Sequence, residues 1–143
     1  GGGWGTPEGD AARVGEVKVR GEARYGRFGG FDLRDDLGNE QRVYQFRDFI
    51  VVVSFERGNS VCETFMKKEG ASSGPGVSTL EIERILAANE PKGSDWRTRI
   101  ESISWETSDG KLEAINLFGR LQVSTKGYGA RMRALHERQE RGR

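Results

Sequence analysis

The stretch Phe49-Ile50-Val51-Val52-Val53-Ser54-Phe55 contains the longest apolar run of the chain. Nearly all of its residues are β-branched or aromatic, and such side chains fit a pleated surface that is packed on one or both faces. The turn signal Arg57-Gly58-Asn59-Ser60 follows at once, and a second run, Val61-Cys62-Glu63-Thr64-Phe65-Met66, comes after it. We therefore expect a central hairpin on which the other elements pack.

The turn sets the expected register of this hairpin. A two-residue loop at Gly58-Asn59 would place Phe55 opposite Cys62 and Val53 opposite Thr64. One face would then hold six residues together: Val51, Val53, Phe55, Cys62, Thr64 and Met66. Phe65 and Val52 would face the other way, so both faces of the hairpin are expected to be partly covered. In this register Cys62 is a small buried hydrophobe.

Further strands and turns flank the hairpin. The segment 42–46 predicts a strand, joined to the central one by the tight turn Arg47-Asp48, which gives a meander over about 42–67. A second meander, over about 101–125, has an Asp109-Gly110 turn that places Trp105 opposite Ala114. Upstream, the alternation in 14–20 favours a strand over a helix, and the glycine-rich 26–38 reads as a long loop.

Two helices are expected. Ser78-Thr79-Leu80-Glu81 reads as a capping box that opens a helix over about 79–89, with Ile82, Ile85 and Leu86 on one face. A second, basic helix is expected over about 129–140. The prediction is an α+β fold of two antiparallel three-stranded meanders (about 42–67 and 101–125), each followed by a helix (about 79–89 and 129–140).

Composition sets limits on organisation and chemistry. The 143 residues suit one domain over 11–143, after a glycine-rich flexible arm at 1–10. A single cysteine excludes an intrachain disulfide and a multi-thiolate metal site. We expect no catalytic residues, cofactor or metal, and no apolar stretch approaches the ~20 residues that span a bilayer. The acidic cluster at Asp32, Asp35, Asp36 and Glu40 lacks calcium-loop spacing and reads as a solvated turn.

Nucleic-acid binding is the alternative function. The segment 20–31 interleaves arginine with aromatic residues, and the C-terminal helix is basic, although 23 basic and 22 acidic residues almost cancel over the whole chain. The candidate contact residues are Arg24, Tyr25, Arg27, Lys126, Arg131, Arg133 and Arg138.

The spacing of aromatic residues and turns over residues 25–125 resembles a pattern found in known proteins. It runs through Tyr25-Gly26, Val43-Tyr44-Gln45-Phe46, Val53-Ser54-Phe55-Glu56-Arg57-Gly58, Glu63-Thr64-Phe65-Met66-Lys67, Ser78-Thr79-Leu80-Glu81-Ile82, Leu86-Ala87-Ala88-Asn89, Trp96, and Trp105 ahead of Asp109-Gly110. This pattern resembles small uncharacterised bacterial exported proteins and is similar in layout to the SmpA/OmlA-type lipoproteins, which assist outer-membrane protein assembly. No lipid-attachment cysteine is present, because Cys62 is internal, and no functional residue carries over. The resemblance implies export, with the signal segment absent from this chain, and a scaffold or protein-binding role.

The leading hypothesis is a non-catalytic protein-binding or assembly domain. It follows from the lack of catalytic motifs and from strand-rich halves whose outer strands could pair with a partner or with a second copy. The compartment stays open on sequence grounds.

Overall fold

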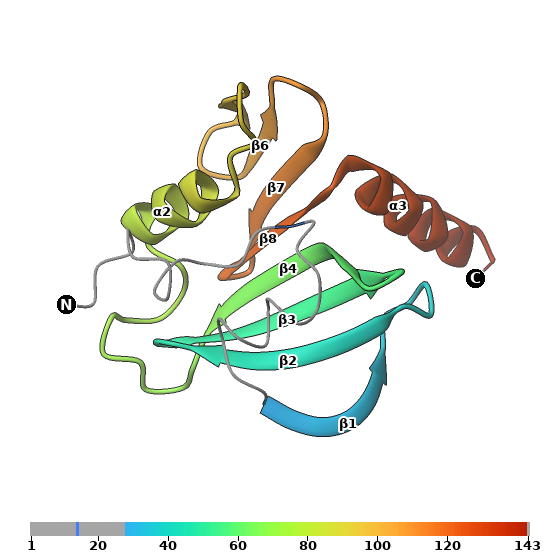
Figure 1. Cartoon of the computed structure of the whole chain (residues 1–143), viewed down its shortest axis with the longest axis horizontal. Helices are drawn as coiled ribbons and strands as arrows, with labels where there is room; N and C mark the ends of the chain where they lie inside the picture. Colours follow the sequence, from blue (N-terminus) through green and yellow to red (C-terminus); the bar gives the residue numbers. More distant parts are fainter. Residues whose placement is uncertain (1–13, 15–27, 143) are drawn as a thin grey trace.

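The computed structural model describes residue 14 and residues 28–142. In this part of the chain eight strands form one antiparallel sheet, in the order β1-β2-β3-β4-β8-β7-β6-β5 (Figure 1). The strands are β1 (Phe28–Arg34), β2 (Glu40–Phe46), β3 (Phe49–Glu56), β4 (Asn59–Lys67), β5 (Trp96–Ile100), β6 (Ser104–Thr107), β7 (Leu112–Leu117) and β8 (Arg120–Thr125). The helices are α2 (Thr79–Asn89) and α3 (Lys126–Arg141). The protein is α+β, and the sheet dominates it.

The prediction of two three-stranded meanders, each followed by a helix, is wrong. Each meander has four strands, and the two join through β4 and β8, where Phe65 pairs with Leu121. The first missed strand, β1, lies in the expected loop 26–38 and pairs with β2. Its glycines disfavour a strand locally, but backbone hydrogen bonds to a neighbour outweigh a weak propensity. The other missed strand, β5, is an exposed edge without an apolar pattern.

The predicted register of the central hairpin is also wrong, by one residue. The turn is Arg57-Gly58, with Glu56 paired to Asn59, and both turn residues have positive φ (53° and 80°). Val53 therefore faces Glu63, and a bulge follows at Ser54. Because neighbouring strand residues point to opposite faces, this slip moves Cys62, Thr64 and Met66 off the main core face. Glu63 and Phe65 take their place, and Cys62 is buried on the other side.

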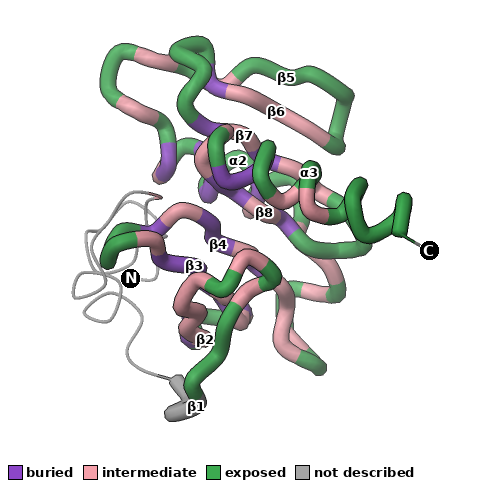
Figure 2. The backbone as a smooth tube through the Cα atoms, turned by 90° about the vertical axis from the view of Figure 1, so that its right-hand side faces the viewer, coloured by how far each residue is buried: buried purple, intermediate pink, exposed green. Residues whose placement is uncertain are grey.

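The main core lies between α2 and one face of the sheet. Phe49 and Phe65 meet edge to face in its centre, with ring centroids 5.9 Å apart. The capping box is confirmed: the Ser78 hydroxyl accepts from the Glu81 amide, and Glu81 accepts from the Ser78 amide. The predicted apolar face of α2 is buried. Figure 2 shows buried positions gathered in the central strands and exposed ones along α3.

The C-terminal helix packs against the opposite face of the sheet. It begins at Lys126, three residues before the predicted start, because the Thr125 hydroxyl caps it by accepting from the Tyr128 amide at 3.1 Å. Tyr128 reaches Ser54, which neighbours the core residue Val53 in β3 and therefore points away from the core. The predicted pairing of Trp105 with Ala114 is confirmed.

The N-terminal predictions fall mostly outside the described residues. These are the flexible arm at 1–10 and the strand over 14–20, of which Val14 alone is described. The Val14 amide donates to the Asn89 side chain at 2.8 Å, and its side chain packs against the core. Neither described helix has the length and apolar character needed to cross a membrane.

Candidate protein-binding surface

Helix α3 covers half of the sheet face that lies opposite the main core. Beneath it runs a row of small and acidic residues from paired strands, Ser54, Cys62, Ser124 and Glu113. Gly129 of the helix lies so close to Glu113 that an added Cβ would come within 2.8 Å of the carboxylate. The helix can approach the sheet this closely because it presents glycine at the contact.

Ion pairs attach the basic residues of α3 to the sheet and its turns. Lys126 binds Glu106, Arg131 binds Glu56, and Arg133 binds Glu113 through two hydrogen bonds of 2.7 and 3.1 Å. These charges are therefore largely neutralised within the molecule. The Lys126 hydrogen bond is the main influence that lowers the pKa of Glu106.

A buried tyrosine fixes the start of the helix. The Tyr128 hydroxyl donates to Asp35 at 2.8 Å and lies 3.4 Å from the Ser54 hydroxyl. Burial raises the pKa of Asp35, but hydrogen bonds from Tyr128 and Asn39 outweigh it and bring the pKa below 3.8. Burial raises the pKa of Cys62 to about 12, which leaves this thiol protonated and a poor nucleophile. The cluster thus holds α3 in place and offers no activated group.

The other half of this sheet face is not covered by α3. One cross-strand row runs from β2 to β7 through Val43, Val52, Thr64, Gln122 and Ile115, and all five are half-buried. We call the apolar residues of this half the open sheet face: Val43, Ile50, Val52, Met66, Ile115 and Leu117. Apolar side chains that remain partly exposed on one face of a sheet suit contact with another protein.

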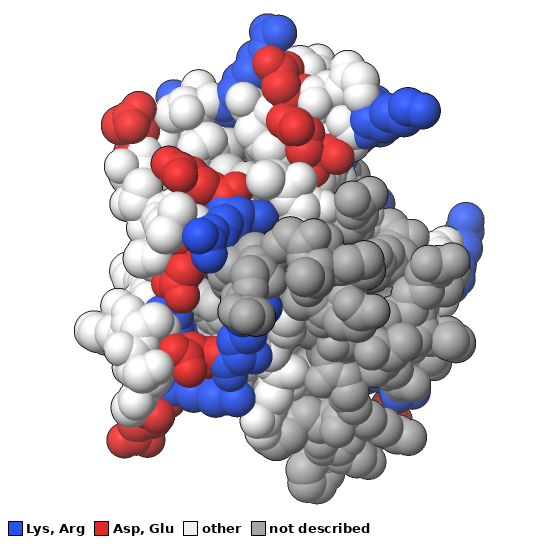
Figure 3. Space-filling model, turned by 60° about the vertical axis from the view of Figure 1, so that its left-hand side comes forward, with Lys and Arg blue, Asp and Glu red and all other residues white. Residues whose placement is uncertain are grey.

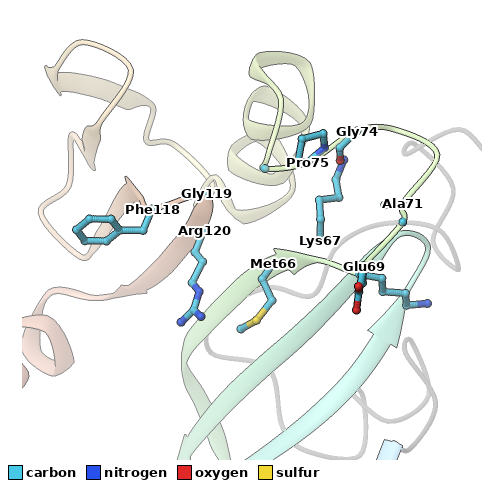
Figure 4. Close-up of a pocket in the computed structure, with 12 residues that line it drawn as sticks. Met66, Lys67, Glu69, Ala71, Gly74, Pro75, Phe118, Gly119 and Arg120 are labelled. Atoms are coloured by element: carbon cyan, nitrogen blue, oxygen red, sulfur yellow. The ribbon is translucent and has the colours of Figure 1, made fainter.

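Two neighbouring hollows lie on this surface. A groove of about 390 Å³ is lined by Gln41, Val52, Thr64, Met66, Ile115, Leu117, Arg120 and Gln122. A second hollow of about 490 Å³ lies between the loop after β4 and the β7–β8 turn, and it shares Met66 and Arg120 with the first. In Figure 4, Met66 and Arg120 project to the same side from β4 and β8, whereas Phe118 projects away from them. The two hollows are therefore neighbours along one path, with Met66 and Arg120 between them.

Phe118 stands at the end of this path, in the β7–β8 turn. Its side chain is 96% exposed, and its backbone has a φ of 55°, in the left-handed region that favours glycine or asparagine. The neighbouring Leu117 is also exposed, and so are Ile100 and Ile103. The β5–β6 turn lies beside the end of β7, because the Asn116 amide donates to the Ile103 carbonyl at 2.7 Å. Exposed apolar side chains thus gather at this end of the sheet.

The predicted nucleic-acid residues do not form one described surface. Arg24, Tyr25 and Arg27 lie outside the described residues. Lys126, Arg131 and Arg133 are the residues that pair with carboxylates of the sheet, while Arg138 is exposed near the end of α3. On the side of the molecule seen in Figure 3, basic and acidic side chains alternate, with no single sign dominating the part that is described.

The one cysteine and the one histidine of the chain lie in different surroundings. His136 is exposed on α3, where its Nε2 lies 3.2 Å from Asp36, whereas Cys62 is buried. No group of three or more potential metal ligands occurs within residue 14 and residues 28–142.

Sequence reasoning missed the open sheet face. Its six residues come from four strands, β2, β3, β4 and β7, and the register error placed Met66 in the core. One signal was present in the sequence: Phe118 precedes Gly119 in a two-residue turn, where a bulky aromatic residue is unfavourable unless it serves another purpose.

Comparison of the chain with protein-family models, with curated proteins and with solved structures finds no match.

Proposed function

We propose that this protein is a non-catalytic protein-binding domain that contacts its partner with the open sheet face and Phe118. The observation that carries the proposal is the groove itself, in which aliphatic side chains alternate with neutral polar ones and beyond which Phe118 is almost fully exposed. Protein interfaces concentrate their binding energy in aromatic and apolar anchors surrounded by polar groups. Here Gln41, Thr64 and Gln122 supply the polar groups.

The cost of exposing Phe118 supports the same proposal. A non-glycine residue with left-handed φ is less favourable by about 1–2 kcal/mol than in an ordinary conformation. At 96% exposure the side chain gains almost no burial within the chain to offset this cost. Such a residue is better explained by contact with another molecule than by folding.

Site-specific photocrosslinking tests the proposal. A photoreactive amino acid replaces Phe118 in the full chain, in its source cells, and a second variant carries it at Leu80. Leu80 is a matched control because it is also apolar and exposed, at 55%, but belongs to α2. We expect a discrete crosslinked protein at position 118 and none at position 80. Equal crosslinking at both positions, or none at 118, would contradict the proposal.

The nucleic-acid alternative remains a prediction. It requires binding that weakens steeply with salt and is lost when Arg131, Arg133 and Arg138 are replaced by alanine. The ion pairs of Arg131 and Arg133 with the sheet count against a strong electrostatic contribution. Export, which the resemblance to exported proteins implies, is likewise a prediction, and fractionation of source cells tests it.

A further inference from the structure

The charge on the groove points to the chemistry of its occupant. Among the described residues that line the 390 Å³ groove, Arg120 alone carries a charge, and none is a carboxylate. The other lining residues are aliphatic or neutral and polar. The groove thus combines aliphatic and neutral polar side chains, with one cation at the end that lies beside the second hollow.

Arg120 has no acidic partner within the described part of the chain. By contrast, nearby Lys67 binds Glu81 at 2.9 Å, and its side chain is almost fully buried. Lys68 donates to the Arg47 carbonyl at 2.8 Å. Arg120 is exposed, and its guanidinium keeps all of its donors available for a ligand. An arginine in this position pairs best with a planar carboxylate, to which it can donate two parallel hydrogen bonds.

The length of the groove fits an extended segment. Its lining residues come from five adjacent strands, β2, β3, β4, β8 and β7. Four spacings of about 4.8 Å give roughly 19 Å, which an extended chain of ~6 residues covers at about 3.3 Å per residue. Gln41, Thr64 and Gln122 lie along this length and offer both donors and acceptors to the backbone of such a segment.

We propose that the groove binds an extended segment of a partner protein in which an aspartate or glutamate lies beside a bulky apolar residue. The carboxylate pairs with Arg120, and the apolar side chain contacts Met66, Val52 and Ile115. The acidic residue is internal to the segment, because the path continues past Arg120 into the second hollow and leaves room for the chain to go on. This inference rests on the proposed function and specifies the partner that it requires.

Selection from a displayed library of linear random peptides, twelve residues long and fused at their C-termini, tests this inference. The targets are the full wild-type chain, Arg120→Glu and a control, Arg138→Glu. The control changes the same charge on exposed α3, away from the groove. Circular dichroism first establishes that all three are folded alike.

We expect wild type and Arg138→Glu to select peptides with an acidic residue next to a large apolar one, and Arg120→Glu to select a basic residue there. A selected acidic peptide should bind Arg120→Glu at least about tenfold more weakly than wild type, the size of effect known for charge-assisted pairs.

The results separate this inference from the proposed function. Selected peptides without acidic enrichment, or with enrichment that survives Arg120→Glu, would overturn the inference and leave a protein-binding surface intact. The same holds if no peptide is selected while Phe118 still crosslinks to a partner. Acidic enrichment that depends on Arg120 supports both the inference and the function. Failure of the selection together with failure of crosslinking at 118 would overturn both.

Discussion

The Tyr128 hydroxyl donates a 2.8 Å hydrogen bond to the Asp35 carboxylate across 93 positions of sequence. This contact joins the first turn of α3 to the turn between β1 and β2. It therefore links the C-terminal helix to the β1 edge of the sheet, at the opposite end from β5. The backbone amides of Leu37 and Asn39 also donate to the same carboxylate, at 3.0 and 2.8 Å.

Removal of this hydroxyl should destabilise the protein moderately. Tyr128→Phe keeps the buried ring but withdraws one donor from an ionised acceptor, so we expect a loss of ~1–2 kcal/mol in the free energy of unfolding. Urea titration at neutral pH measures it. A loss below about 0.3 kcal/mol would mean that water replaces the hydroxyl without penalty.

The stability should fall in acid partly because of Asp35. Its pKa in the folded protein is below 3.8, the ordinary value, because hydrogen bonds outweigh the effect of burial. Above pH 3.8 the carboxylate is ionised in both states and its stabilisation is complete. As the pH falls from 3.8 through the lower folded pKa, the unfolded chain binds the proton first and this stabilisation is lost. Asp35→Asn should therefore lose less stability than wild type between pH 7 and pH 3 in urea titrations. Equal losses would contradict this role of Asp35.

Two glycines of α3 should respond in opposite ways to alanine. At Gly129 the new methyl group would meet the Glu113 carboxylate, which Arg133 holds in place. Gly129→Ala should therefore lower the free energy of unfolding by ~1–3 kcal/mol. Gly127 is exposed, and the nearest group is the end of the flexible Arg131 side chain at 3.3 Å. Gly127→Ala should raise the free energy of unfolding by up to ~1 kcal/mol, because alanine has a higher helix propensity than glycine. Thermal and urea unfolding of both variants check this contrast, and a gain at both positions would show that α3 does not pack closely on Glu113.

Cys62 should resist thiol reagents in the folded protein. It is buried and its pKa is raised to about 12, so almost none of it is thiolate at pH 8. Labelling should therefore proceed through opening of the structure, and Gly129→Ala should accelerate it more than Gly127→Ala. Rapid labelling of the native wild type, at the rate of a free thiol, would place Cys62 at an accessible surface.

Phe118 should matter for binding and not for folding. Asparagine adopts left-handed φ more readily than phenylalanine, so Phe118→Asn should leave the free energy of unfolding unchanged or raise it by up to ~1 kcal/mol. The same variant should weaken capture of the crosslinked partner. As a control, Phe65→Ala, at a fully buried position, should lose ~3–5 kcal/mol. A large loss of stability in Phe118→Asn would mean that Phe118 has a structural role.

Sequence reasoning located the elements with strong local signals. The capping box predicted the start of α2 correctly, because its two residues, Ser78 and Glu81, lie within four positions of each other in the sequence. The central strand was found from its β-branched run, and the Asp109-Gly110 turn gave the correct pairing of Trp105. The candidate site was not found, because its residues are far apart in sequence and each is unremarkable in its own strand.

The amino-acid sequence by itself determined the central strands, helix α2 with its cap, the Trp105 pairing, and the lack of thiol or histidine clusters. Local hydrogen bonds and side-chain periodicity settle these features, and both can be read over a few residues. The tertiary structure decided the join between β4 and β8, the left-handed turn at Arg57-Gly58, and the half of the sheet that α3 leaves uncovered. These depend on contacts between distant segments, and a shift of one residue in register exchanges the two faces of a strand.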